Sequence, residues 1–139
     1  MRTVPFTVGQ RAELRRTVTE ADVVGFAGLS GDFNPLHLDA VYAARTRFGQ
    51  RVAHGMLLGG FVSAVLGMRL PGPGAILLSC RLDFRKPTYV GDTLTAWAEV
   101  VAVRQDKPVV TLWVGCTNHR GEVVAQGEAV CYWEPVEQT

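Results

Sequence analysis

An aspartate and a histidine, Asp32 and His37, lie five residues apart in a segment that contains turn-forming residues. Gly31 and the Asn34-Pro35 pair predict a bent loop, because Asn-Pro starts turns and the residue before a proline avoids the helical region. Such a loop can direct both side chains toward one point, which a regular helix or strand would not do at this spacing. A carboxylate beside an imidazole can move protons near neutral pH. We therefore expect Asp32 and His37 to be catalytic acid–base residues.

A second segment, His54-Gly55-Met56-Leu57, opens the most apolar helical pattern in the sequence. The first turn of a helix offers free backbone N–H groups and the positive end of the helix dipole. The N–H of Gly55 is therefore a candidate oxyanion donor. Together with an acid–base pair, it suits the addition or removal of water beside a carbonyl group. His54 itself is interpreted as structural, a side chain that bonds to backbone and shapes the start of the helix.

Each of these residues also has an ordinary structural explanation. An aspartate after a glycine often only caps a turn, and a histidine near a helix is often held by backbone hydrogen bonds. The third polar residue of the loop, Asn34, is expected to fix the loop or to orient the Asp32/His37 pair. His119 lies in a predicted hairpin turn and is expected to be solvated.

Length, charge and cysteine content narrow the class of protein. The chain has 139 residues, which predicts a single domain over residues 1–139. Its 14 Lys and Arg balance 13 Asp and Glu, a net charge of +1 that gives no reason to expect nucleic acid or an anionic membrane as partner. Met1–Gln10 shows no signal-peptide pattern, and the apolar stretch Met56–Met68 is too short to span a bilayer.

The three cysteines, Cys80, Cys116 and Cys131, are widely spaced among apolar residues. They indicate small buried side chains in a reduced, cytoplasmic protein. No cysteine or histidine pair has the spacing of metal ligands, so we expect no metal site.

Hydrophobic periodicity changes from helical to alternating along the chain. Helices are expected at about Glu20–Leu29, Ala40–Arg47 and Gly55–Leu70, long strands at Ile76–Arg85, Leu94–Val103, Val109–Thr117 and Val123–Tyr132, and a short edge strand at Pro5–Val8. Four consecutive strands joined by turns predict an antiparallel meander. The helix at Gly55–Leu70 is apolar on nearly every side, so we expect the sheet to wrap around it, with Ala96, Ala98 and Ala102 facing it. The predicted class is α+β, and the exposed sheet edges favour a homodimer.

Gly31-Asp32-Phe33-Asn34-Pro35-Leu36-His37, then His54-Gly55-Met56-Leu57 and Val90-Gly91-Asp92, resemble the R-specific enoyl-CoA hydratases of the MaoC-like dehydratase family. The resemblance runs from about Phe26 to Val130 and shows no departure at the catalytic positions. It implies the hot dog fold, an antiparallel sheet around a long central helix, with active sites at a dimer interface.

The resemblance also implies a reaction. A trans-2-enoyl-CoA thioester would be hydrated to (R)-3-hydroxyacyl-CoA, and the reverse dehydration would occur at the same site. No cofactor is expected, because no electrons move. Three alternatives remain: dehydration of a 3-hydroxyacyl-carrier protein, acyl-CoA thioester hydrolysis on the same fold, and non-catalytic acyl-CoA binding. The Asp32/His37 pair argues against the last of these.

Further residues of the predicted helix are expected to support the catalytic pair or to contact the substrate. Ser63 lies eight residues beyond Gly55; the resemblance implies that it holds Asp32 or His37, although a helix serine also commonly bonds back to a carbonyl. Gly59, Val62 and Leu66 share the Gly55 stripe and are predicted to line an acyl tunnel for short to medium chains. Five basic residues are expected either to contact the phosphates of coenzyme A or to be solvated. They are Arg45, Arg47, Arg51, Arg85 and Lys86.

Overall fold

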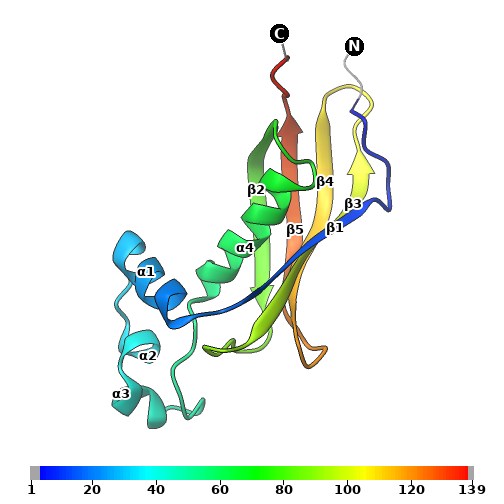
Figure 1. Ribbon diagram of the computed structural model, residues 1–139. Coiled ribbons are helices and arrows are strands. Elements are labelled where there is room, and N and C mark those ends of the chain that lie inside the picture. Colours follow the sequence, from blue (N-terminus) through cyan, green and yellow to red (C-terminus); the bar gives the residue numbers. More distant parts are fainter. Residues whose placement is uncertain (1–3, 138–139) are drawn as a thin grey trace.

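Five antiparallel strands form one sheet in the order β1-β3-β4-β5-β2 (Figure 1). The computed structural model describes residues 4–137, so the ends of the predicted domain and part of Met1–Gln10 lie outside the described residues. The strands are β1 (Arg11–Thr17), β2 (Ala75–Phe84), β3 (Thr93–Val103), β4 (Val109–Asn118) and β5 (Val123–Trp133), and the helices are α1 (Glu20–Ser30), α2 (Pro35–Leu38), α3 (Ala40–Ala44) and α4 (Gly55–Met68). Figure 1 shows α4 along one face of the sheet, with α1, α2 and α3 gathered at one end.

The predicted four-strand meander is correct for β3, β4 and β5 and wrong for β2. β2 pairs with β5 at the edge of the sheet, while β3 pairs with β1 and β4. The segment 85–92 therefore crosses from one edge to another part of the sheet instead of forming a hairpin. Local periodicity identifies a strand but does not choose its neighbours.

The first strand lies at Arg11–Thr17, so the predicted edge strand at Pro5–Val8 is wrong. Only Ala12 and Leu14 of β1 pack toward the core, and charged residues occupy most other positions. Because these positions are charged, the segment lacks the alternation of apolar and polar residues by which a strand is predicted from sequence. The charge also suits an edge position, because charged side chains discourage pairing with another chain.

The hydrophobic core lies between α4 and the inner face of the sheet. Its members from α4 and the central strands include Leu58, Phe61, Val65, Leu94, Ala96, Ala98, Val100, Leu112, Val114 and Ala129. Burying each large apolar side chain contributes roughly 1.5–3 kcal/mol relative to leaving it exposed. An antiparallel sheet packed against one long helix confirms the predicted hot dog fold. Ala102 does not face α4, because a bulge between Val100 and Ala102 reverses the alternation and turns Val103 toward the core instead.

One side of α4 is not covered by the sheet, so the expectation of a fully wrapped helix is wrong for the protomer. Met56 is 65% exposed, and Gly60, Ser63 and Gly67 continue the exposed stripe. None of the helices within residues 4–137 is long and apolar enough to cross a membrane.

Next to this stripe, β2 is an edge strand with exposed apolar side chains instead of the predicted half-buried alternation. Leu78 is 56% exposed, and Ile76, Leu77 and Phe84 are each nearly half exposed. The edge position also exposes Cys80, which was predicted to be buried, whereas Cys116 and Cys131 are buried as predicted.

Candidate active site

The loop after α1 holds Asp32 through a chain of local hydrogen bonds. Gly31 ends α1 with φ +83°, a left-handed conformation that glycine adopts without strain. The backbone N–H of Asp32 donates to Ser30 Oγ at 3.2 Å, and Asp32 Oδ1 accepts from the N–H of Asn34 at 3.2 Å. Asn34 Oδ1 in turn caps α2 by accepting from the N–H of Leu36 at 3.0 Å. Asn34 therefore fixes the loop.

His37 is oriented by a backbone carbonyl. Its Nδ1 lies 2.6 Å from the carbonyl oxygen of Val52. A carbonyl oxygen only accepts, so Nδ1 carries the hydrogen and donates it. Nε2 is then the nitrogen left to exchange a proton with a bound molecule.

The loop and the two histidines meet at one point. A carboxylate oxygen of Asp32, a ring nitrogen of His37 and a ring nitrogen of His54 all lie within 4.8 Å of one another. The two imidazole rings stack, with centroids 3.8 Å apart and planes 28° apart. The sequence spacing correctly predicted that Asp32 and His37 lie close together. It did not predict the stacking of His54 on His37.

A carboxylate and two imidazoles so close together also form a possible metal-ligand set, which sequence spacing does not indicate. Each ring already has one nitrogen engaged with a carbonyl oxygen, His37 with Val52 and His54 with Asp32. The His37 and His54 rings also stack on each other, with their planes 28° apart. We therefore interpret the group as an acid–base site.

Gly55 and His37 line the same cavity, which has a volume of about 370 Å³. Because α4 begins at Gly55, the backbone N–H of that residue has no partner within the helix. A Cβ at Gly55 would lie 3.2 Å from the Phe84 ring, so the missing side chain lets that ring close the cavity wall. The other lining residues are Leu36, Arg47, Phe48, Val52, Ala53, Leu58, Arg85, Lys86, Pro87 and Thr88.

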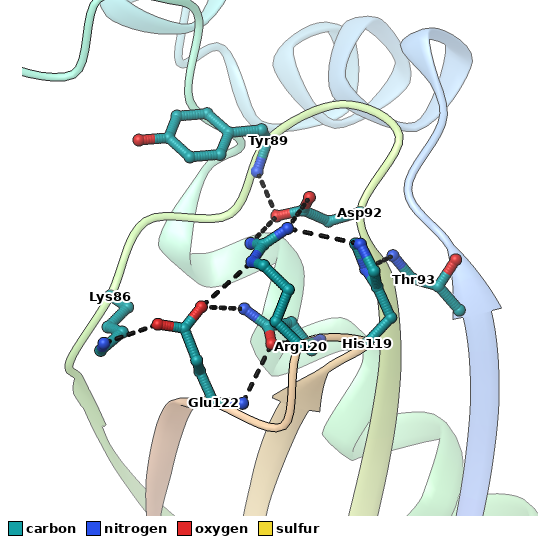
Figure 2. A network of polar contacts seen from close by, with 8 residues as sticks. Lys86, Tyr89, Asp92, Thr93, His119, Arg120 and Glu122 are labelled. Carbon is teal, nitrogen blue, oxygen red and sulfur yellow. Dashed lines mark hydrogen bonds and ion pairs between the residues drawn. The ribbon is translucent and has the colours of Figure 1, made fainter.

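A polar network anchors the 85–92 segment (Figure 2). Residues 85–88 of this segment line the cavity. The buried Asp92 carboxylate accepts from the N–H of Tyr89 at 3.0 Å and pairs with both terminal nitrogens of Arg120 at 3.2 Å. Arg120 also donates to Glu122, which accepts from Lys86 at 2.6 Å. His119 lies beside this network; it is exposed as predicted, and its Nδ1 accepts from the N–H of Thr93.

Hydrogen bonds in this network change the acidity of Glu122. Donation from Lys86, and then from Asn118 and Arg120, lowers the pKa of the Glu122 carboxyl from 4.5 to about 2. The carboxylate is therefore charged at neutral pH, and it ties Lys86 of the cavity wall to the β4–β5 turn.

The structure does not bring every predicted site residue to the cavity. Ser63 is exposed, and within residues 4–137 it makes no hydrogen bond to Asp32 or His37. Val62 and Leu66 are buried in the core, and neither lines the cavity, nor does Gly59. Asp32 and Asn34 are exposed beside the cavity residue His37 and are not themselves among the lining residues. Arg51 is engaged elsewhere: it pairs with both carboxylate oxygens of Glu20 at 2.9 Å and donates to the carbonyl of His37.

Comparison with known proteins identifies the family of the chain. The family described as MaoC like domain matches residues 6–118, most of the chain. The chain belongs to the MaoC-like family. This MaoC-like protein is 48% identical to the (R)-specific enoyl-CoA hydratase of Aeromonas caviae over 123 residues, 88% of this chain and 92% of the relative. It is 50% identical over 121 residues to a protein of the same name from Rhodospirillum rubrum, 87% of this chain and 83% of the relative.

A solved structure also resembles this MaoC-like protein closely. The (R)-hydratase from A. caviae involved in PHA biosynthesis superimposes with a TM-score of 0.90 at 46% identity, over 93% of this chain and 98% of the other. The MaoC-like chain thus shares both the fold and nearly half of its residues with that hydratase.

Proposed function

We propose that this protein adds water to trans-2-enoyl-CoA, giving (R)-3-hydroxyacyl-CoA, and catalyses the reverse dehydration. One observation carries the proposal: Asp32 and His37 place a carboxylate oxygen and a ring nitrogen within 4.8 Å, and His37 lines a cavity together with Gly55, whose N–H has no partner within α4. The (R) configuration is supported by the names of the two relatives.

In the proposed mechanism, the thioester carbonyl accepts from the N–H of Gly55, which stabilises the enolate that forms during addition. Asp32 and Nε2 of His37 together take a proton from water as its oxygen bonds to C3. The same pair delivers a proton to C2, and the carbonyl is restored. The net change is one water added across the double bond, with no oxidation or reduction.

Two arginines that line the cavity favour coenzyme A as the carrier of the acyl group. Arg47 lies over the Phe48 ring at 4.7 Å, and Arg85 begins the 85–92 segment. Neither has an ion pair with an acidic side chain in the part of the chain that the structure describes, and no acidic residue lines the cavity there. We propose that these guanidinium groups receive the carrier's phosphates, since arginine matches phosphate geometry. Lys86 is already paired with Glu122, and the Arg85 guanidinium donates to the side-chain oxygen of Gln126 at 3.0 Å, so Arg47 is the strongest of the three candidates.

We also propose a homodimer formed through β2. The two sheet edges differ, because β1 is charged whereas β2 exposes Ile76, Leu77 and Leu78 beside the uncovered stripe of α4. Pairing two β2 edges satisfies the open backbone groups and buries both apolar surfaces. Ser63 belongs to that stripe, so its supporting role remains a prediction for the assembled dimer. The three free cysteines fit the reducing conditions of the cytoplasm, where we place this step of fatty-acid metabolism.

A single assay separates the proposed reaction from thioester hydrolysis. Crotonyl-CoA is followed by loss of enoyl absorbance, with a thiol reagent in a parallel reaction. Hydration removes the absorbance without releasing thiol, and the product should be the (R) enantiomer. Thiol release would indicate a thioesterase. Activity on an acyl-carrier-protein thioester but not on crotonyl-CoA would indicate a 3-hydroxyacyl-carrier-protein dehydratase.

A further inference from the structure

His54 contacts both proposed catalytic residues and also precedes the proposed oxyanion donor. Its Nε2 lies 3.0 Å from the backbone carbonyl oxygen of Asp32, and its ring stacks on that of His37. A second aromatic neighbour is Phe26 of α1, whose ring centroid is 4.8 Å away. His54 thereby joins α1, the Asp32 loop, α2 and the first residue of α4.

The hydrogen bond to Asp32 determines which nitrogen of His54 carries its hydrogen. The carbonyl oxygen of Asp32 can only accept, so Nε2 must donate. Nδ1 is buried and has no hydrogen-bond partner among the described residues. A hydrogen on Nδ1 would be buried with nothing to accept it, which favours the tautomer with hydrogen on Nε2 alone.

Packing does not explain a histidine at this position. The residue is 2% exposed, and an apolar ring of similar size would fill the space beside Phe26 without leaving a buried nitrogen unpaired. His54 is also the N-cap of α4, yet its side chain makes no capping hydrogen bond. The polar contact that it does make is with the backbone of Asp32.

We infer that His54 is a positioning residue, which holds Asp32 and His37 in their reactive arrangement through its Nε2–H and its stacked ring. Val52 fixes the Nδ1 edge of His37, and His54 supports one face of the ring. The Asp32 backbone is held between Ser30 on one side and His54 on the other. A displacement of about 1 Å in such a pair can cost roughly 10²-fold in rate. This inference rests on the proposed function, because it assigns catalysis to Asp32 and His37.

Two substitutions separate the two contacts. His54→Phe keeps a stacked ring but removes the donor, whereas His54→Gln keeps an N–H of similar reach but removes the ring. We expect His54→Phe to lower kcat on crotonyl-CoA about 10- to 100-fold, as loss of a supporting hydrogen bond does at other sites, with KM changed less than about threefold. His54→Gln should recover part of the loss. Val110→Ala, a fully buried substitution in β4, is the control for general destabilisation and should keep kcat at temperatures where it is folded.

A kcat for folded His54→Phe within about threefold of the wild type would overturn the inference, as would an equal loss in Val110→Ala. A second measurement needs no variant: ¹⁵N-histidine NMR of the wild-type protein should show His54 with its hydrogen on Nε2, and an Nδ1–H tautomer would also overturn it. Failure of the wild type to hydrate crotonyl-CoA would instead refute the proposed function, while the NMR result would still test the His54–Asp32 bond.

Discussion

His37 donates its Nδ1–H to the carbonyl oxygen of Val52 over 2.6 Å. Val52 forms a β-bridge with Tyr89, and the next residue, Ala53, donates its N–H to the carbonyl of Thr88. The orientation of the imidazole therefore depends on the 85–92 segment, which the Asp92–Arg120 ion pair anchors to the β4–β5 turn (Figure 2). The proposed site is supported from the sheet as well as from the helices.

The first prediction concerns the carrier phosphates. Arg47→Gln and Arg85→Gln should each raise KM for crotonyl-CoA roughly three- to tenfold, equivalent to about 1 kcal/mol, with little change in kcat. The same variants should act normally on crotonyl-N-acetylcysteamine, which has no phosphate. Arg104→Gln, at the β3–β4 connection, is the matched control. An equal effect on both thioesters would contradict a phosphate contact.

The second prediction concerns assembly. The wild-type protein should sediment as a dimer at micromolar concentration, and Leu78→Asp should shift it toward monomer by placing a charge on the apolar β2 edge. Val136→Asp, at a position that is 91% exposed beyond β5, should remain dimeric. A wild-type protein that is active as a monomer would refute the proposed dimer.

The third prediction concerns acyl chain length. Leu66 is 3% exposed and lies on the Gly55 stripe, about 16 Å along the helix from Gly55 at 1.5 Å per residue. Leu66 does not line the observed cavity, so the prediction tests whether the acyl tunnel extends to it. If it does, Leu66→Ala should raise kcat/KM for the eight-carbon enoyl-CoA relative to crotonyl-CoA. It should also cost about 2–5 kcal/mol of stability. Leu70→Ala should lose comparable stability without changing the chain preference. An unchanged C8-to-C4 ratio in Leu66→Ala would assign Leu66 to the core alone.

The fourth prediction concerns stability at low pH. The pKa of Glu122 is lowered from 4.5 to about 2, so the folded state binds this proton more weakly than the unfolded state. The stabilisation is complete above about pH 4.5 and is lost as the pH falls toward 2. The difference in Tm between the wild type and Glu122→Gln should therefore shrink over that range. Glu134→Gln, which removes an exposed carboxylate beyond β5, should show no comparable trend. A Tm difference that is independent of pH would contradict the lowered pKa.

The sequence predicted α4 and the four long strands to within one or two residues, because their apolar periodicity is local. It missed β1, whose outward positions are charged, and it placed β2 beside the wrong strand, because pairing depends on tertiary structure. The bulge after Val100 likewise has no local apolar signal and made Ala102 appear to face inward.

The candidate site was predictable to a similar extent. Asp32 and Asn34 share one loop, and His37 follows in the four-residue helix α2, which was not predicted. The approach of Asp32 to His37 still follows from the turn at Asn34-Pro35. The stacking of His54 on His37 joins α2 to the start of α4 across seventeen residues of sequence, so it depends on tertiary packing. The position of His54 directly before a glycine-initiated helix predicted its backbone hydrogen bond, which it makes to the Asp32 carbonyl, but gave no signal for the stacking.

The central claim is that Asp32 and His37 act as one acid–base unit. Asp32→Asn and His37→Gln should each fold and each lose most hydration activity, and the double variant should lose much less than the product of the two losses. Asp106→Asn, an exposed substitution in the β3–β4 connection, is the matched control.

The most direct test is the kcat of Asp32→Asn for crotonyl-CoA hydration, measured beside the wild type and Asp106→Asn with folding checked by melting temperature. A general acid–base group contributes about 10²- to 10⁴-fold. Folded Asp32→Asn should lose kcat in that range, and Asp106→Asn should lose none. A folded Asp32→Asn variant that retains kcat within about tenfold of the wild type would contradict the central claim.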